Sequence, residues 1–184
     1  MSEAHMRRMS AEAREEYEAL SLDAPETTAG LHPVAGRGSL KKRAISAPDV
    51  LNEAYDYAAP ATFTRGMRVE LPGASMLYLS GTASVDENGL SVHPGDFAAQ
   101  CWRTYRNLTH LLAAEHASWH DIFRTTCYLR DIERDYDEFN CIRGTFFKMV
   151  GLNPLPASTG IQARLCRSDL LVEIEAIAMI PGPK

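Results

Sequence analysis

Two carboxylates, Glu173 and Glu175, lie in an apolar segment near the C-terminus, where they could do acid–base chemistry. If the segment is a strand, small and β-branched residues at positions 172 to 178 share one face and both glutamates share the other. That second face also carries Ile177 and Met179, so it is too apolar to lie open to water. A carboxyl group half-buried on such a face has a raised pKa, which suits a general acid or a base that activates water.

Hydroxyl groups follow a Pro-Ala pair at Ser158 and Thr159, where they could hydrogen-bond a carboxylate or a carbonyl. No histidine or lysine lies nearby in the sequence to activate Ser158, which argues against a serine nucleophile. His116 and His120 have the spacing of a helical metal pair, but they fall where the predicted helix ends and no third ligand is evident, so we expect no metal site. A glycine-rich phosphate loop is absent, and we expect no cofactor.

The elements that position these residues follow from hydrophobic period and turn signals. Pro72-Gly73 predicts a hairpin, and Asp96 predicts the start of a helix that runs to about Ala114. Asp135 and Glu138 have the spacing of a capping box for a second helix, which Asn153-Pro154 ends. Strands are predicted over 63–71, 75–83, 122–131, 158–166 and 170–180. The order strand, strand, helix, strand, helix, strand, strand predicts an α+β fold, with one sheet and both helices on one face.

The first sixty residues lack the regular hydrophobic pattern of the rest, so we predict an N-terminal arm over 1–60 and a domain over 61–184. Ser10–Leu20 and Pro48–Ala58 are predicted as short helices, and residues 22–46 as a linker rich in Pro, Gly, Ser and Thr. The formal net charge of -5, with no stripe of Lys or Arg, argues against nucleic acid as a partner. No apolar run is long enough to cross a membrane. The charged N-terminus and four separated cysteines favour a cytoplasmic protein.

Several motifs together carry a family likeness, and they occur in the order and spacing of the Rid/YjgF superfamily. They are SGTAS (80–84), GDFAAQ (95–100), the NL pair (107–108), YLRD (128–131), Asn140, PAST (156–159) and EIEAIA (173–178). The chain resembles this superfamily over roughly residues 63–180. The resemblance implies a chorismate-mutase-like homotrimer with clefts between subunits. In one branch of the family these clefts hydrolyse enamine or imine intermediates derived from amino acids.

The resemblance also implies roles for particular residues. Glu175 matches the catalytic glutamate of the last strand, and Asn140 matches a position near the cleft that orients water or substrate. The deaminase branch has an arginine where this chain has Ser158, and commonly a cysteine where it has Gly160. Candidate replacements for that guanidinium are Arg130, Arg143 and Arg167, of which a similarity of 166–173 to chorismatases favours Arg167. The other expected binding residues are Ser158, Thr159, Gly160, Tyr128, Phe63, Ser80 and Thr82.

These observations favour an enzyme that hydrolyses or eliminates from a small unsaturated carboxylate, imine or enamine, with a chorismatase-like reaction also open. The alternative is a non-catalytic trimer that binds a ligand or a partner. An RNA-cleaving role has no support in the charge or aromatic pattern.

Overall fold

The turn at Pro72-Gly73 joins two strands, as its residue types predict. The computed structural model describes residues 40–182, and in it β2 (Gly66–Leu71) pairs antiparallel with β3 (Ala74–Ala83). Gly73 has φ of 79°, a left-handed conformation that glycine adopts without steric cost. Because β3 is longer than β2, its other edge can pair along its length with a distant strand, β6 (Val172–Pro181).

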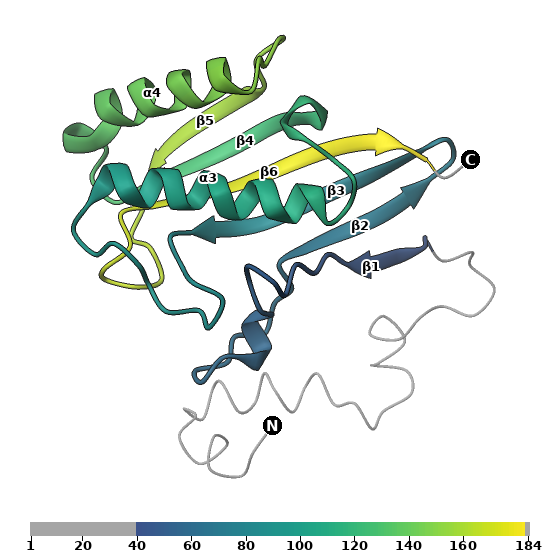
Figure 1. Ribbon diagram of the computed structural model, residues 1–184, viewed down its shortest axis with the longest axis horizontal. Helices are drawn as coiled ribbons and strands as arrows, with labels where there is room; N and C mark the ends of the chain where they lie inside the picture. Colours follow the sequence, from purple (N-terminus) through teal and green to yellow (C-terminus); the bar gives the residue numbers. More distant parts are fainter. Residues whose placement is uncertain (1–39, 183–184) are drawn as a thin grey trace, which may run out of the picture. The chain divides into compact units, whose positions relative to one another are not determined.

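The remaining elements complete one mixed sheet with two helices, which confirms the predicted order (Figure 1). They are α3 (Phe97–Ala113), η2 (Trp119–Asp121), β4 (Ile122–Leu129), α4 (Ile132–Met149) and β5 (Ala157–Gln162). The strand order is β1-β2-β3-β6-β4-β5, so the last strand lies in the middle of the sheet. None of the helices within residues 40–182 is long and apolar enough to cross a membrane.

Alternation along β6 separates a core face from a second face, as the sequence predicts. Val172, Ile174, Ala176 and Ala178 are at most 1% exposed and form part of the core. Both helices cover this face (Figure 1). Glu173 and Glu175 belong to the second face, which is turned away from the helices and is only partly buried in one chain. We call this second side the open face of the sheet.

The helix starts show one correct prediction and one correction. Asp96 caps α3, since its side chain accepts a hydrogen bond from the Ala99 amide at 2.9 Å. The cap of α4 is Asp131, which accepts from the Arg134 amide at 3.1 Å, and not Asp135. Asp135 instead lies buried inside the first turn. The same helix ends at Met149, ahead of Asn153-Pro154, because Gly151 takes the left-handed conformation that closes a helix.

Residues 40–60 form part of the packed unit, which differs from the predicted arm. Lys42–Ala44 forms β1, an edge strand beside β2, where a linker was expected. The helix expected over 48–58 is reduced to a turn and a three-residue 3-10 helix, η1 (Ala54–Asp56). Ile45 and Leu51 are fully buried, so burial of a few apolar side chains overrides helix propensity here. The helix expected at Ser10–Leu20 lies outside the described residues.

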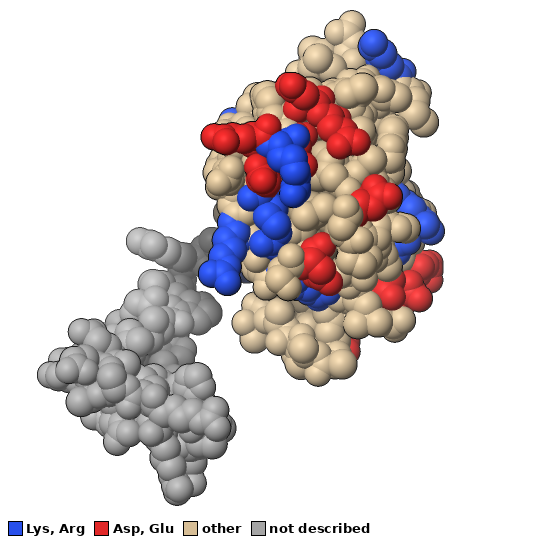
Figure 2. Space-filling model, turned by 90° about the vertical axis from the view of Figure 1, so that its left-hand side faces the viewer, with Lys and Arg blue, Asp and Glu red and all other residues tan. Residues whose placement is uncertain are grey.

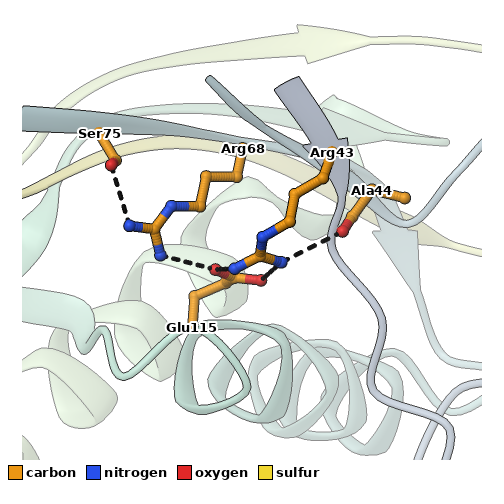
Figure 3. Close-up of polar contacts among 5 residues, drawn as sticks. All are labelled: Arg43, Ala44, Arg68, Ser75 and Glu115. Atoms are coloured by element: carbon orange, nitrogen blue, oxygen red, sulfur yellow. Dashed lines mark hydrogen bonds and ion pairs between the residues drawn. The ribbon is translucent and has the colours of Figure 1, made fainter. Parts of the chain in front are cut away.

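A buried carboxylate ties β1 to the end of α3 (Figure 3). Both carboxylate oxygens of Glu115, whose side chain is 2% exposed, accept hydrogen bonds from Arg43, at 2.7 and 2.6 Å. Arg68 on β2 donates to the same carboxylate at 3.1 Å and to the Ser75 hydroxyl at 3.0 Å. Two arginines therefore neutralise one buried charge, and one of them holds β1 against the end of α3.

Candidate active site

A hollow of about 410 Å³ with charged groups in its lining lies at the β6 end that carries Glu173. Its walls come from the segment before β2, from the end of β3 and the loop that follows, and from the loop before β6. Most of the lining is apolar, and the ionisable groups in it are Tyr57, Arg65, Cys166, Arg167 and Glu173. A mostly apolar hollow with a few convergent polar groups is the usual form of a small-molecule site. We call it the Glu173 pocket.

Glu173 is held closely against the backbone of β3. A β-carbon added at Gly81 would lie 2.0 Å from the carboxylate oxygen of Glu173, so only glycine leaves room for this side chain. Burial, and then the charge of Glu175, raise the pKa of Glu173. Glu173 is therefore a candidate for the acid–base role that the resemblance implies for Glu175. A carboxyl group with a raised pKa keeps its proton to a higher pH than an ordinary glutamate does, which suits it to donate a proton.

Arg167 lines the same pocket, and Arg130 holds the loop that carries it. Arg167 donates to the backbone carbonyl of Gly89 and lies 3.4 Å from the Ser91 hydroxyl. Arg130 donates to the carbonyls of Leu170 and Arg167, so its guanidinium is used to position that loop. Of the two candidate arginines, Arg167 is the one in the pocket lining.

Of the two aromatic residues expected around the ligand, only Phe63 lines the Glu173 pocket. It is 43% exposed. Tyr128 lies opposite Glu173 on the neighbouring strand β4, on the same face but outside the pocket lining. Burial, and then the charge of Glu175, raise the pKa of Tyr128.

Glu175 lies in a second, smaller hollow on the open face, of about 300 Å³. Ser80 lines it, and its hydroxyl donates to the Thr64 carbonyl at 2.7 Å. Thr82 is 2% exposed and donates to the Ser80 carbonyl, because a register irregularity between Leu79 and Thr82 turns the two hydroxyls to different sides. The residues expected to contact a ligand from β3 are therefore not together.

Ser158 and Asn140 form a separate cluster at the edge of the sheet, on its helix side. Ser158 accepts hydrogen bonds from Thr125 at 3.0 Å and from Arg143 of α4 at 3.2 Å. Arg143 also donates to the side-chain oxygen of Asn140. Of the three candidate arginines, Arg143 is therefore the one beside Ser158. Thr125 lies opposite core-facing Ala176, which places this cluster on the face away from both glutamates.

The next two residues of β5 illustrate the same alternation. Thr159 lies on the open face with Glu175, because both residues pair with Thr126 of β4 in the sheet. Its hydroxyl accepts a hydrogen bond from Arg124 at 2.9 Å. Gly160 is exposed, and a β-carbon there would approach only Tyr136. Ser158 and Thr159 therefore cannot serve one ligand within a single chain, since successive side chains of a strand point to opposite faces.

Two pocket residues, Arg65 and Tyr57, are not among those expected from the sequence. Arg65 stands one residue before β2, and Tyr57 lies in the segment that the sequence reads as an arm. The sequence offers one signal for Arg65. In a strand, residues 63, 65 and 67 share one face, so Arg65 falls between two apolar side chains, Phe63 and Met67. That pattern alone does not say that Arg65 becomes buried.

Comparisons with known proteins agree with this fold. The sequence profile of the endoribonuclease L-PSP family matches residues 55–180. The chain belongs to this family, the Rid/YjgF superfamily. The structure of the YjgF gene product of Escherichia coli superposes with a TM-score of 0.59 and 26% identity, over 74% of this chain and 97% of that one.

Two curated relatives within the Rid/YjgF superfamily carry names of enzymes. The chain is 31% identical over 106 residues to the 3-aminoacrylate deaminase RutC of Acinetobacter baylyi, which covers 58% of this chain and 80% of that one. It is also 31% identical over 107 residues to the 2-iminobutanoate/2-iminopropanoate deaminase of the rat, with 58% and 74% covered.

Surface charge and possible metal ligands were the other two features that could indicate a binding site. Basic and acidic side chains lie interspersed on the face shown in Figure 2, with no continuous basic stripe there. Within residues 40–182, no three His, Cys, Asp or Glu side chains are grouped so that they could hold a metal ion. His120 contacts the Val150 carbonyl, and His116 lies beyond the end of α3.

Proposed function

We propose that this protein hydrolyses the imine or enamine of a small amino-acid-derived carboxylate in the Glu173 pocket, releasing ammonia and a 2-oxo acid. Support comes from membership of the Rid/YjgF superfamily and from relatives named as 3-aminoacrylate and 2-iminobutanoate/2-iminopropanoate deaminases. The observation that carries the proposal is the carboxyl of Glu173, whose pKa is raised in a mostly apolar pocket.

The chemistry needs one group that both gives and takes a proton. Protonated Glu173 donates its proton to the imine nitrogen, which makes the carbon of the C=N bond more electrophilic. Water attacks that carbon, a C–O bond forms, and the resulting carboxylate of Glu173 takes a proton from the water. Glu173 then donates this proton to the amine nitrogen, the C–N bond of the tetrahedral intermediate breaks and ammonia leaves. The hydroxyl group returns its proton to Glu173 as the C=O bond forms, which restores the starting state of the carboxyl group.

The test compares two carboxylates on the same strand. An amino acid oxidase would generate 2-iminobutanoate from 2-aminobutanoate in the presence of semicarbazide, which traps any imine that survives. We expect the wild-type protein to suppress the trapped product, and Glu173→Gln to lose this effect by at least about 100-fold. Glu175→Gln is the matched control and should keep most of the activity. If instead Glu175→Gln is inactive and Glu173→Gln is active, the smaller hollow is the reaction site.

The second candidate function is binding without catalysis. The observation that favours it is Ser158, which stands where the resemblance to the deaminase branch expects an arginine. Saturable binding of 2-oxobutanoate without turnover of any imine would support this function. A parallel incubation with chorismate, assayed for pyruvate, tests the chorismatase-like reaction.

We also propose that the protein is a cytoplasmic homotrimer that covers the open face. Several apolar side chains on this face are 40% to 44% exposed in one chain, namely Tyr78, Ile161 and Met179. An apolar surface of this kind is normally covered by association. The four cysteines are free thiols in the structure, as in a reducing compartment.

A further inference from the structure

Arg65 is the most deeply buried cation of the pocket, and neighbouring residues hold it rigidly. It is 5% exposed. Its Nε donates to the Asn52 carbonyl at 3.0 Å, and its Nη2 donates to the Tyr57 hydroxyl. The guanidinium carbon lies 4.9 Å from the centre of the Tyr57 ring and 5.5 Å from that of Phe63. Contact with aromatic rings stabilises the cation only in part.

No carboxylate within residues 40–182 forms an ion pair with this guanidinium. The nearest candidate is Glu53, but its carboxylate accepts from the backbone amide of Arg65 at 3.3 Å and forms no ion pair with the side chain. Nη1 of Arg65 donates no hydrogen bond to any described residue, although Nε and Nη2 both do. A buried, unpaired charge costs several kcal/mol, and an anion that binds to it recovers much of that cost.

The charge balance of the pocket points the same way. Arg65 and Arg167 contribute two positive charges to the lining, and Glu173 is its one carboxyl group. Burial lowers the pKa of Arg65, and the nearby charge of Arg167 acts in the same direction. Glu53 behind Arg65 compensates one positive charge. When Glu173 is protonated, one positive charge remains, which a single carboxylate neutralises.

We propose that Arg65 is the residue that binds the substrate carboxylate, through Nη1, with Arg167 as a second positive charge. This inference rests on the proposed function, because it concerns the same pocket. It explains how a chain with Ser158 at the edge of the sheet can bind a carboxylate on the open face. It also gives residues 52–57 a role, since Asn52 and Tyr57 orient the guanidinium.

The experiment uses 2-oxobutanoate, the product of 2-iminobutanoate hydrolysis, as the binding probe. Isothermal titration calorimetry would compare the wild type with Arg65→Met and Arg65→Lys. We expect Arg65→Met to bind about 100-fold more weakly, because a buried charge pair is lost. Arg65→Lys keeps the charge but loses the planar fork, and should bind about 10-fold more weakly. Arg164→Met, which removes an exposed arginine outside the pocket, is the matched control and should bind as the wild type does.

A thermal-unfolding readout separates binding from folding. Arg65→Met is judged on the rise in Tm that the ligand gives and not on the Tm of the free protein, because the substitution removes a buried charge but also takes a nearby cation away from Glu53. It should lose the rise in Tm that 2-oxobutanoate gives the wild type. If Arg65→Met fails to fold, Arg65→Lys and Tyr57→Phe, which removes only the hydroxyl that Arg65 contacts, carry the test. Wild-type affinity in these variants overturns the proposal.

The outcomes also separate this inference from the proposed function. If the wild type hydrolyses imines and Arg65→Met does so with unchanged KM, the function stands and the role of Arg65 is wrong. If 2-oxobutanoate binds through Arg65 but no imine is hydrolysed, the inference stands and the proposed function is wrong. If the wild type neither binds 2-oxobutanoate nor hydrolyses imines, both are wrong.

Discussion

The close approach of Glu173 to Gly81 gives a prediction that depends on one methyl group. In Gly81→Ala the new β-carbon would lie 2.0 Å from the Glu173 carboxylate oxygen, whereas ordinary contact begins at 3.4 Å. The carboxylate must therefore move by about 1.4 Å. Because the clash is with the far end of a flexible side chain, the strand itself need not shift. A misplacement of about 1 Å in a catalytic group can cost about 100-fold in rate. We expect kcat/KM for 2-iminobutanoate to fall by about that factor.

The assay measures kcat/KM and Tm for two glycine-to-alanine variants. Gly144→Ala on α4 is the control, because a β-carbon there meets nothing within 4 Å. It should keep full activity and gain stability of about 1 kcal/mol, the usual difference between Ala and Gly in a helix. Gly81→Ala should keep its Tm within a few degrees. Wild-type kcat/KM in a folded Gly81→Ala protein would refute the placement of Glu173 in the catalytic step.

Four further predictions concern the protonation of Glu173, the attachment of β1 and assembly. The alkaline limb of the kcat/KM profile, where Glu173 loses the proton that it must donate, should lie above the ordinary glutamate range and move down in Glu175→Gln, which removes a like charge. Since folding raises the pKa of Glu173, the contribution of this group to stability is present in acid and lost as pH rises through that pKa. In denaturant unfolding, Glu173→Gln should remove this part of the pH dependence of the free energy of unfolding. Glu115→Ala should lower the free energy of unfolding by about 3 kcal/mol, because a buried carboxylate that pairs two arginines is lost, whereas Arg43→Ala, at an exposed partner, should cost about 1 kcal/mol or less. Met179→Glu should shift sedimentation from trimer toward monomer, and an unchanged trimer would contradict the proposed interface.

The order of elements could be predicted because each depends on local signals. Pro72-Gly73 specifies its hairpin through glycine geometry, and Asp96 specifies a helix start by accepting a backbone hydrogen bond. The cap at Asp135 was predicted wrongly because Asp131, four residues earlier, offers the same chemistry. Local spacing does not determine which of the two aspartates caps α4. The end of β4 at Leu129 determines it, because only Arg130 separates Asp131 from that strand.

The site was harder to predict because it depends on which face each side chain takes and on distant contacts. Alternation in β6 places Glu173 and Glu175 on one face, but only the approach of Gly81 distinguishes their surroundings. Arg65 becomes buried because Asn52 and Tyr57, in a segment with no clear period, fold back over it. Contacts of this kind are set by tertiary packing and leave no local pattern in the sequence.

A crystal structure of the protein with 2-oxobutanoate would test the central claim most directly. The carboxylate of the ligand should contact Arg65, and its carbonyl carbon should face Glu173 in the pocket beside Gly81. Ligand bound instead beside Ser158 and Arg143, or in the hollow of Glu175, would show that the reaction site lies elsewhere in the molecule.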